Sequence, residues 1–137
     1  MSTKSKRIYT SNYARCGESK HSISISASAP DYFAGPHMTV LAPSWDLLNQ
    51  YKKGTVSKSM YKNEYIKLLE GRKLTPQIVY DSIPHEAILL CYERAGEFCH
   101  RRILADWLEN DLNVRIPEWE SDDERKKSEF VDNVLDF

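Results

Sequence analysis

Apolar and polar residues change their spacing several times along the chain, and each change marks an expected element of secondary structure. Isoleucine and serine alternate after His21, which is the period of a strand with one apolar face. The residues before Cys91 form an uninterrupted apolar run, which is typical of a strand buried on both faces in a parallel sheet. The strands predicted in this way are Lys6–Asn12, His21–Pro30, Met38–Ser44, His85–Cys91 and Asn113–Pro117.

Between these strands, apolar residues recur at steps of three and four residues, which predicts helices. One helix is expected to begin after Ser44 as its N-cap and to end at Gly54, and a second to begin after Ser57. A third is expected over Pro76–Ser82, because proline is favoured at the first helical position. A fourth is expected over Phe98–Asn110.

The order of these elements predicts the α/β class, as a single three-layer domain with a largely parallel, Rossmann-like sheet. A chain of 137 residues has room for one domain with its own core. We expect this domain to span residues 1–119. Residues 120–137 are rich in charge and are expected to form a tail that is either helical or loose at the surface.

The composition argues against several classes of protein. With 19 basic and 20 acidic residues the net charge is −1, so only a local basic patch could attract nucleic acid. Three cysteines are an odd number for a disulfide framework. No apolar run reaches the roughly 20 residues of a membrane span, and the N-terminus lacks the apolar core of a secretory signal. The sequence therefore predicts a cytoplasmic protein with no membrane partner.

Residues that can bind or react gather where the strand ending at Cys91 gives way to the last predicted helix. Glu93 leaves the strand, Gly96 permits a turn, and Cys99–Arg101 are predicted to occupy the first helical turn. In open α/β sheets, ligands collect at the carboxyl ends of the strands. The free N–H groups at a helix start favour an anion and lower the pKa of a thiol. This junction is therefore the predicted site.

The segment LLCYERAGEFCHRRILADWL resembles the C-terminal signature of the domain-of-unknown-function 488 (DUF488) family, in which a strand ends in Cys-x-Glu and Cys-His-Arg opens a helix. The residues that carry the resemblance are Cys91, Glu93, Cys99, His100 and Arg101. A looser similarity extends over residues 7–119. The resemblance implies a small α/β domain with its site at this junction, and it carries over no settled activity.

Two familiar kinds of site do not fit the spacing of the cysteines. A cysteine phosphatase or rhodanese loop needs an arginine six residues after the cysteine, and no cysteine of this chain is followed by one at that distance. A structural zinc site pairs its ligands closely, whereas seven residues separate Cys91 from Cys99. The neighbouring Cys99 and His100 would point about 100° apart on a helix. We therefore predict no metal ion and no cofactor.

Cys99 has two opposite interpretations. In an enzyme it would be the nucleophile, and Glu93 or His100 would move protons. However, Cys99 shares a helical face with Trp107, which predicts a sulfur that points into the core and resists alkylation. In that case His100 and Arg101 face the open side of the helix and line a binding pocket.

A binding site is the leading prediction. The turn that follows the first strand is dense in hydrogen-bonding and stacking groups, which suit a nucleotide or another ligand that bears a phosphate. Arg101 is predicted to supply the contact to the anion. The residues predicted to line the pocket are Tyr9, Thr10, Ser11, Asn12, Tyr13, Arg15, Cys91, Glu93, His100 and Arg101.

The expected partner is a small phosphate-containing ligand or nucleotide, with a nucleic-acid end or single strand as a further option. An enzyme that acts on such a ligand is the alternative, and a protein-interaction module that acts through the tail is the third. The small size fits a phage-type accessory protein. The sequence leaves open the identity of the ligand, the occurrence of a reaction and the oligomeric state.

Overall fold

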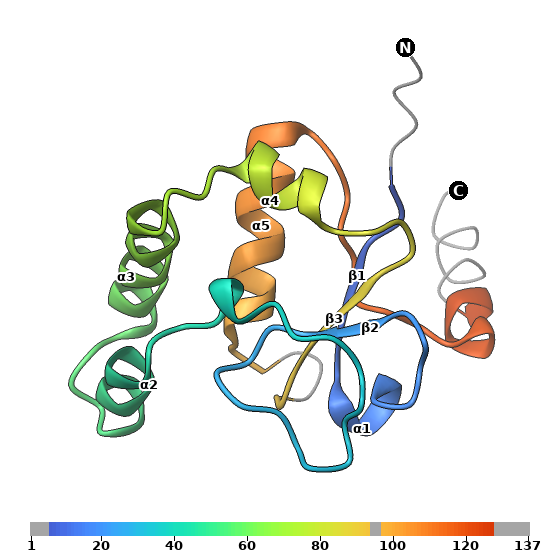
Figure 1. Cartoon of the computed structure of the whole chain (residues 1–137), viewed down its shortest axis with the longest axis horizontal. Coiled ribbons are helices and arrows are strands. Elements are labelled where there is room, and N and C mark those ends of the chain that lie inside the picture. Colours follow the sequence, from blue (N-terminus) through green and yellow to red (C-terminus); the bar gives the residue numbers. More distant parts are fainter. Residues whose placement is uncertain (1–5, 94–96, 128–137) are drawn as a thin grey trace.

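The computed structural model describes residues 6–93 and 97–127, and it has the α/β architecture that the sequence predicts (Figure 1). A parallel sheet lies at its centre, formed by β1 (Tyr9–Asn12), β2 (Ser22–Ser24) and β3 (Ile88–Cys91). The strand order is β1-β3-β2, so β3 is the central strand. All four residues of β3 are buried, as expected for an apolar strand with a neighbour on each side.

The register of the sheet brings the carboxyl ends of the strands together. Asn12 pairs with Cys91, and Ser24 pairs with Leu90 one step earlier. The backbone N–H of Ile25 then donates to the carbonyl oxygen of Leu90 over 3.1 Å, which continues the contact past the end of β2. Cys91 therefore lies between the ends of both neighbouring strands.

The helices cover both faces of this sheet. Their bounds are α1 (Tyr13–Cys16), the 3-10 helix η1 (Thr39–Leu41), α2 (Trp45–Lys52), α3 (Lys58–Gly71), α4 (Pro76–Ser82) and α5 (His100–Leu112). The predicted N-caps Ser44, Ser57 and Thr75 are confirmed, because each side chain accepts a hydrogen bond from the backbone N–H three residues later.

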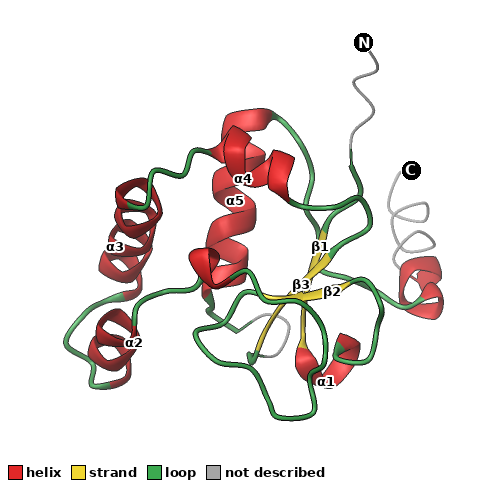
Figure 2. Cartoon of the chain, viewed as in Figure 1, coloured by secondary structure: helices red, strands yellow, loops and turns green. Residues whose placement is uncertain are grey.

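The two faces of β3 pack against different apolar clusters, which gives the domain its layers. Leu89 belongs to the larger cluster, together with residues of α2, α3, α4 and α5. Ile88 and Leu90 belong to the smaller cluster, together with Tyr13 and Cys16 of α1. Figure 2 shows α5 beside the sheet, with α2 and α3 farther from it.

Three of the predicted strands are confirmed with shorter bounds, but the strand predicted over Met38–Ser44 is wrong. This segment contains η1 instead. A single bridge joins Ser24 to His37, after which the chain leaves the sheet. Pro36 precedes the segment and Pro43 lies within it, and proline has no N–H group with which to continue a ladder.

The strand predicted over Asn113–Pro117 is also wrong. The chain does reach the free edge of β1, but it forms one bridge there, between Glu118 and Thr10. The backbone N–H of Thr10 donates to the carbonyl oxygen of Pro117 over 3.0 Å. Pro117 itself cannot donate to the sheet, so the pairing stays short.

Residues 122–127 of the charged tail are helical. The rest of the tail, residues 128–137, and the predicted turn residue Gly96 lie outside the described residues. Within the described part of the chain, no helix combines the length and the apolar composition that a bilayer crossing requires.

Candidate functional site

Two hollows meet at the carboxyl end of β3, and together they form what we call the β3 cleft. The first has a volume of about 410 Å³ and is lined by the segment after β2, by α2, and by Cys91 and His100. The second has a volume of about 490 Å³ and is lined by α2, α3 and Cys99. The residues that line both hollows are Leu48, Lys52 and Glu93.

The two cysteines of the cleft share a hydrogen bond and a neighbouring cation. Cys91 ends β3, and Cys99 is the N-cap of α5, with an extended backbone. Their thiols are hydrogen-bonded to each other, and Nη1 of Arg101 donates to Sγ of Cys91 over 2.9 Å. The prediction that Cys99 lies inside the first helical turn is wrong, because α5 begins at His100.

The hydrogen bond between the thiols separates their pKa values. It lowers the pKa of Cys99, against the effect of burial, and the charge of Arg101 and the backbone N–H groups of Arg101 and Arg102 act in the same direction. The pKa of Cys91 is raised, first by its hydrogen bond to Cys99 and then by burial. The pair therefore loses its first proton from Cys99.

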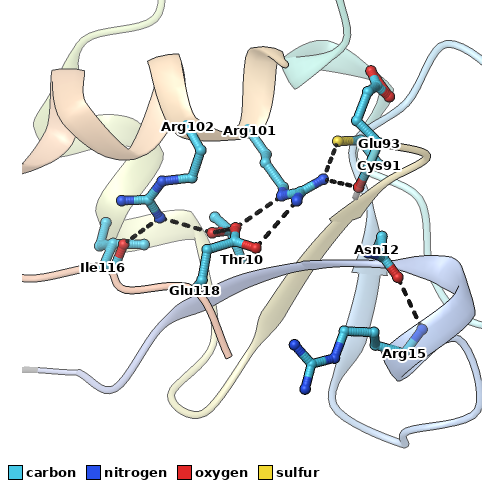
Figure 3. Close-up of polar contacts among 9 residues, drawn as sticks. All are labelled: Thr10, Asn12, Arg15, Cys91, Glu93, Arg101, Arg102, Ile116 and Glu118. Carbon is cyan, nitrogen blue, oxygen red and sulfur yellow. Dashed lines mark hydrogen bonds and ion pairs between the residues drawn. The ribbon is translucent and has the colours of Figure 1, made fainter. Parts of the chain in front are cut away.

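Arg101 is a buried residue that connects the end of β3 with Glu118. Its side chain is 0% exposed, and its Nε and Nη2 atoms donate to the two carboxylate oxygens of Glu118 over 2.8 and 3.1 Å. Its Nη1 atom also donates to the backbone oxygen of Glu93 over 2.7 Å (Figure 3). The prediction that Arg101 faces a binding pocket is wrong, because Arg101 is buried and lines neither hollow, whereas His100 is buried but lines the first hollow.

Glu118 is ionised in this arrangement. Burial opposes its charge, but hydrogen bonds from Arg101 and Thr10 outweigh burial and lower its pKa. Arg102 supports the same contact, because its Nη1 atom donates to Oγ1 of Thr10 and to the carbonyl oxygen of Ile116, each over 2.8 Å. Figure 3 shows how this network joins the start of α5, β1 and the segment that follows α5.

His100 is held as a neutral imidazole. It is 3% exposed, and its Nε2 atom lies 2.7 Å from the carbonyl oxygen of Ile25, so Nε2 carries the proton and donates it. The ring also contacts Tyr65 edge-on, with centroids 5.6 Å apart. Burial lowers the pKa of His100 to about 4, although the bond to Ile25 acts in the opposite direction.

Glu93 is the acidic residue that faces both hollows. Its carboxylate points away from Arg101, whose contact is with the backbone oxygen of Glu93 (Figure 3). Burial raises the pKa of the Glu93 carboxyl, although the charges of Arg101 and Lys52 partly offset the effect. Glu93 can therefore hold a proton at a higher pH than an ordinary glutamate.

The predicted turn after β1 lies behind the cleft, and the lining of the two hollows includes none of residues 9–15. Thr10, Ser11 and Asn12 are buried. Thr10 donates to Glu118, and Ser11 forms a hydrogen bond with the thiol of Cys16. The side chain of Asn12 accepts a hydrogen bond from the backbone N–H of Arg15 and caps α1, which the sequence predicted only as a polar turn.

The remaining residues of this turn also make internal contacts. The hydroxyl of Tyr13 lies 2.7 Å from that of Ser24 and 2.8 Å from that of Ser26. Its ring contacts Tyr92, which lines the first hollow, with centroids 4.9 Å apart. Arg15 pairs with Glu124 and lies over the ring of Trp119, and Tyr9 packs on the smaller cluster. Tyr13 therefore supports the cleft wall from behind.

Sequence reasoning missed Glu118 and Lys52. The signal for Glu118 was the pair of adjacent arginines at the start of a helix, because a buried guanidinium needs an anionic partner. Glu118 follows the last predicted strand, near the end of the predicted domain. Among residues 6–93 and 97–127, no group of three or more His, Cys, Asp or Glu side chains could hold a metal ion.

A family model described as the active DUF488-N3 subclade matches residues 5–112. The chain belongs to the DUF488 family. The matched region contains the whole sheet and α5, including both cysteines of the cleft, and it ends before Glu118. No curated protein and no solved structure matches this DUF488 chain.

The buried state of His100 predicts a loss of stability in acid. Its pKa is about 4 in the fold, compared with 6.5 for an ordinary histidine, so the unfolded chain takes up the proton first as the pH falls. The free energy of unfolding should therefore decrease between pH 7 and pH 5, by about 2 kcal/mol from this group. Urea unfolding of the wild type and of His100→Gln at both pH values measures this contribution.

His85→Gln is the matched control, because His85 is mostly exposed. It should keep the wild-type dependence on pH, whereas His100→Gln should show a smaller one. An equal loss of stability on acidification in the wild type and in His100→Gln would contradict the assignment.

Proposed function

We propose that the chain binds a nucleotide-like ligand, or another small ligand that carries a phosphate, in the β3 cleft. The proposal rests on the observation that Lys52 and two exposed aromatic side chains line the same hollow, the first one. Trp45 is 57% exposed and Tyr92 is 53% exposed. Exposed aromatic rings beside a hollow offer faces on which a planar base can stack.

Two lysines can contact an anion in the cleft, which Glu93 and Glu97 also line. Lys52 lines both hollows and Lys58 lines the second. The Nζ atom of Lys58 lies 5.6 Å from the centroid of the Phe98 ring, and this cation–π contact keeps the ammonium group beside the hollow. Glu93 faces the same space, but burial raises its pKa, so its repulsion of a phosphate is weaker than that of an ordinary carboxylate.

Arg101 has a supporting part in this proposal. Its donors are directed at Glu118, Cys91 and the backbone of Glu93, and it lines neither hollow. The contact to the anion that the sequence assigns to Arg101 is therefore given to Lys52. The net charge of −1 favours a single nucleotide or a nucleic-acid end over a long strand.

Catalysis on the bound ligand is the second candidate. Cys99 lines the second hollow and has a lowered pKa, which suits a nucleophile. Glu93 lines the same hollow and can hold a proton for a leaving group. The matching family model is described as an active subclade, which agrees with this candidate. We further infer a cytoplasmic location, since free cysteines persist in reducing compartments.

Replacing Lys52 with Ala should weaken nucleotide binding by about 1.5 kcal/mol, or roughly tenfold in Kd, because a charge-assisted hydrogen bond to phosphate is lost. A thermal-shift screen with ATP, AMP, adenosine and pyrophosphate identifies the ligand for calorimetry. AMP or ATP should raise Tm more than adenosine or pyrophosphate does, since the cleft offers both stacking and charge.

Lys53→Ala is the matched control, because Lys53 is an exposed neighbour of Lys52 that lines neither hollow. It should bind with the wild-type Kd. The proposal fails if no nucleotide raises Tm, or if the two lysine variants lose affinity equally.

A further inference from the structure

We propose that Cys91 and Cys99 form a redox-active dithiol, which an oxidant of the peroxide class converts into an intramolecular disulfide. Cys91 ends the central strand and Cys99 is the N-cap of α5, and the two cysteines line the two adjoining hollows of the β3 cleft. The inference goes beyond ligand binding and does not depend on it, because it needs the two sulfurs and no nucleotide.

A disulfide requires that its two cysteines be neighbours in the fold. The thiols of Cys91 and Cys99 interact with each other, and Nη1 of Arg101 contacts the sulfur of Cys91 over 2.9 Å. Seven residues, 92–98, separate the cysteines in sequence, which closes a short covalent loop. Both cysteines are free in the structure.

The surroundings distinguish the two sulfurs. Cys99 lines the second hollow, next to the positively charged Arg101 and the N-terminus of α5, which favour its thiolate. The sulfur of Cys91 accepts a hydrogen bond from Nη1 of Arg101, and the Cys91 thiol keeps its proton, since its pKa is raised by the interaction with Cys99 and by burial. Both side chains are almost fully buried, and a peroxide is small enough for a hollow of about 490 Å³.

The chemistry balances in two steps. The Cys99 thiolate attacks one oxygen of the peroxide, the O–O bond breaks, and the products are a sulfenic acid and, after protonation, water or an alcohol. The thiol of Cys91 then attacks the sulfenic sulfur, and the sulfenic hydroxyl leaves with the Cys91 proton as water. The dithiol loses two electrons and two protons overall, and the peroxide is reduced.

The third cysteine is an internal control. Cys16 is buried in the smaller cluster, away from the larger one that covers the other face of β3. Burial raises the pKa of its thiol, against a weaker effect of its hydrogen bond with Ser11. Cys16 is therefore expected to remain reduced under exposure to peroxide that oxidises the pair.

The direct test treats the reduced, folded full chain with a small excess of hydrogen peroxide, alkylates the remaining thiols after unfolding, and maps the peptides by mass spectrometry. We expect a peptide in which Cys91 is cross-linked to Cys99, an alkylated Cys16, and full recovery of the three thiols after dithiothreitol. Oxidation of Cys16 at the same rate as the pair would overturn the proposal. So would sulfinic acids without a cross-link, or no oxidation.

Two variants separate the roles of the sulfurs. In Cys91→Ser, oxidation should stop at a sulfenic acid on Cys99, which dimedone traps. In Cys99→Ser, Cys91 should stay reduced over the same exposure, and Cys16→Ser should form the disulfide as the wild type does. Dimedone labelling of Cys91 in Cys99→Ser at the wild-type rate would contradict the assignment of Cys99 as the attacking thiolate. If a variant does not fold, the peptide map of the wild type still decides the proposal.

Discussion

The buried guanidinium of Arg101 is the constraint on which the rest of this structure depends. A charge removed from water is tolerated only when partners surround it, since the desolvation penalty is several kcal/mol per ion. Glu118 supplies the opposite charge through two hydrogen bonds, and the strand end supplies Sγ of Cys91 and the backbone oxygen of Glu93. The segment after α5 must therefore return to β1, which is where Glu118 forms its bridge with Thr10.

The same cation connects the fold with the chemistry of the cleft. It contacts one sulfur of the Cys91–Cys99 pair and favours the thiolate of the other. The N–H groups of Arg101 are occupied by these contacts. In our proposal, the lysines that line the hollows therefore bind the phosphate. The central strand, the helix start and the cleft are thus positioned by one side chain that does not itself face the ligand space.

Local signals made much of the fold predictable from the sequence. Some signals act within a few residues and can be recognised in one segment of the sequence. They include the N-caps Ser44, Ser57 and Thr75 and the apolar run of β3. The DUF488 resemblance located the junction between β3 and α5. The prediction of a strand over Met38–Ser44 is wrong, because the apolar residues of this segment enter the 3-10 helix η1 and do not form a ladder with the sheet.

The candidate site was predictable only in part, because its partners come from distant segments. Glu118 pairs with an arginine 17 residues away, and Thr10 joins them from the other end of the chain. The polar groups after β1 were expected to face a ligand, yet Tyr13 bonds to Ser24 and Ser26, and Asn12 caps α1. Whether a polar group faces solvent or another element depends on the packing of the layers, which no local pattern encodes.

A double-mutant cycle on Arg101 and Glu118 tests this account most directly. Urea unfolding at pH 7 would be compared for the wild type, Arg101→Met, Glu118→Gln and the double variant, with Glu120→Gln as an exposed control. Glu118→Gln leaves the buried guanidinium of Arg101 without its anion and should lose about 3 kcal/mol or more, whereas Arg101→Met leaves the 27% exposed Glu118 without its cation and should lose less. The double variant should lose well under the sum, with a coupling of at least about 2 kcal/mol. Single effects that add to within about 0.5 kcal/mol would contradict the central place of this ion pair.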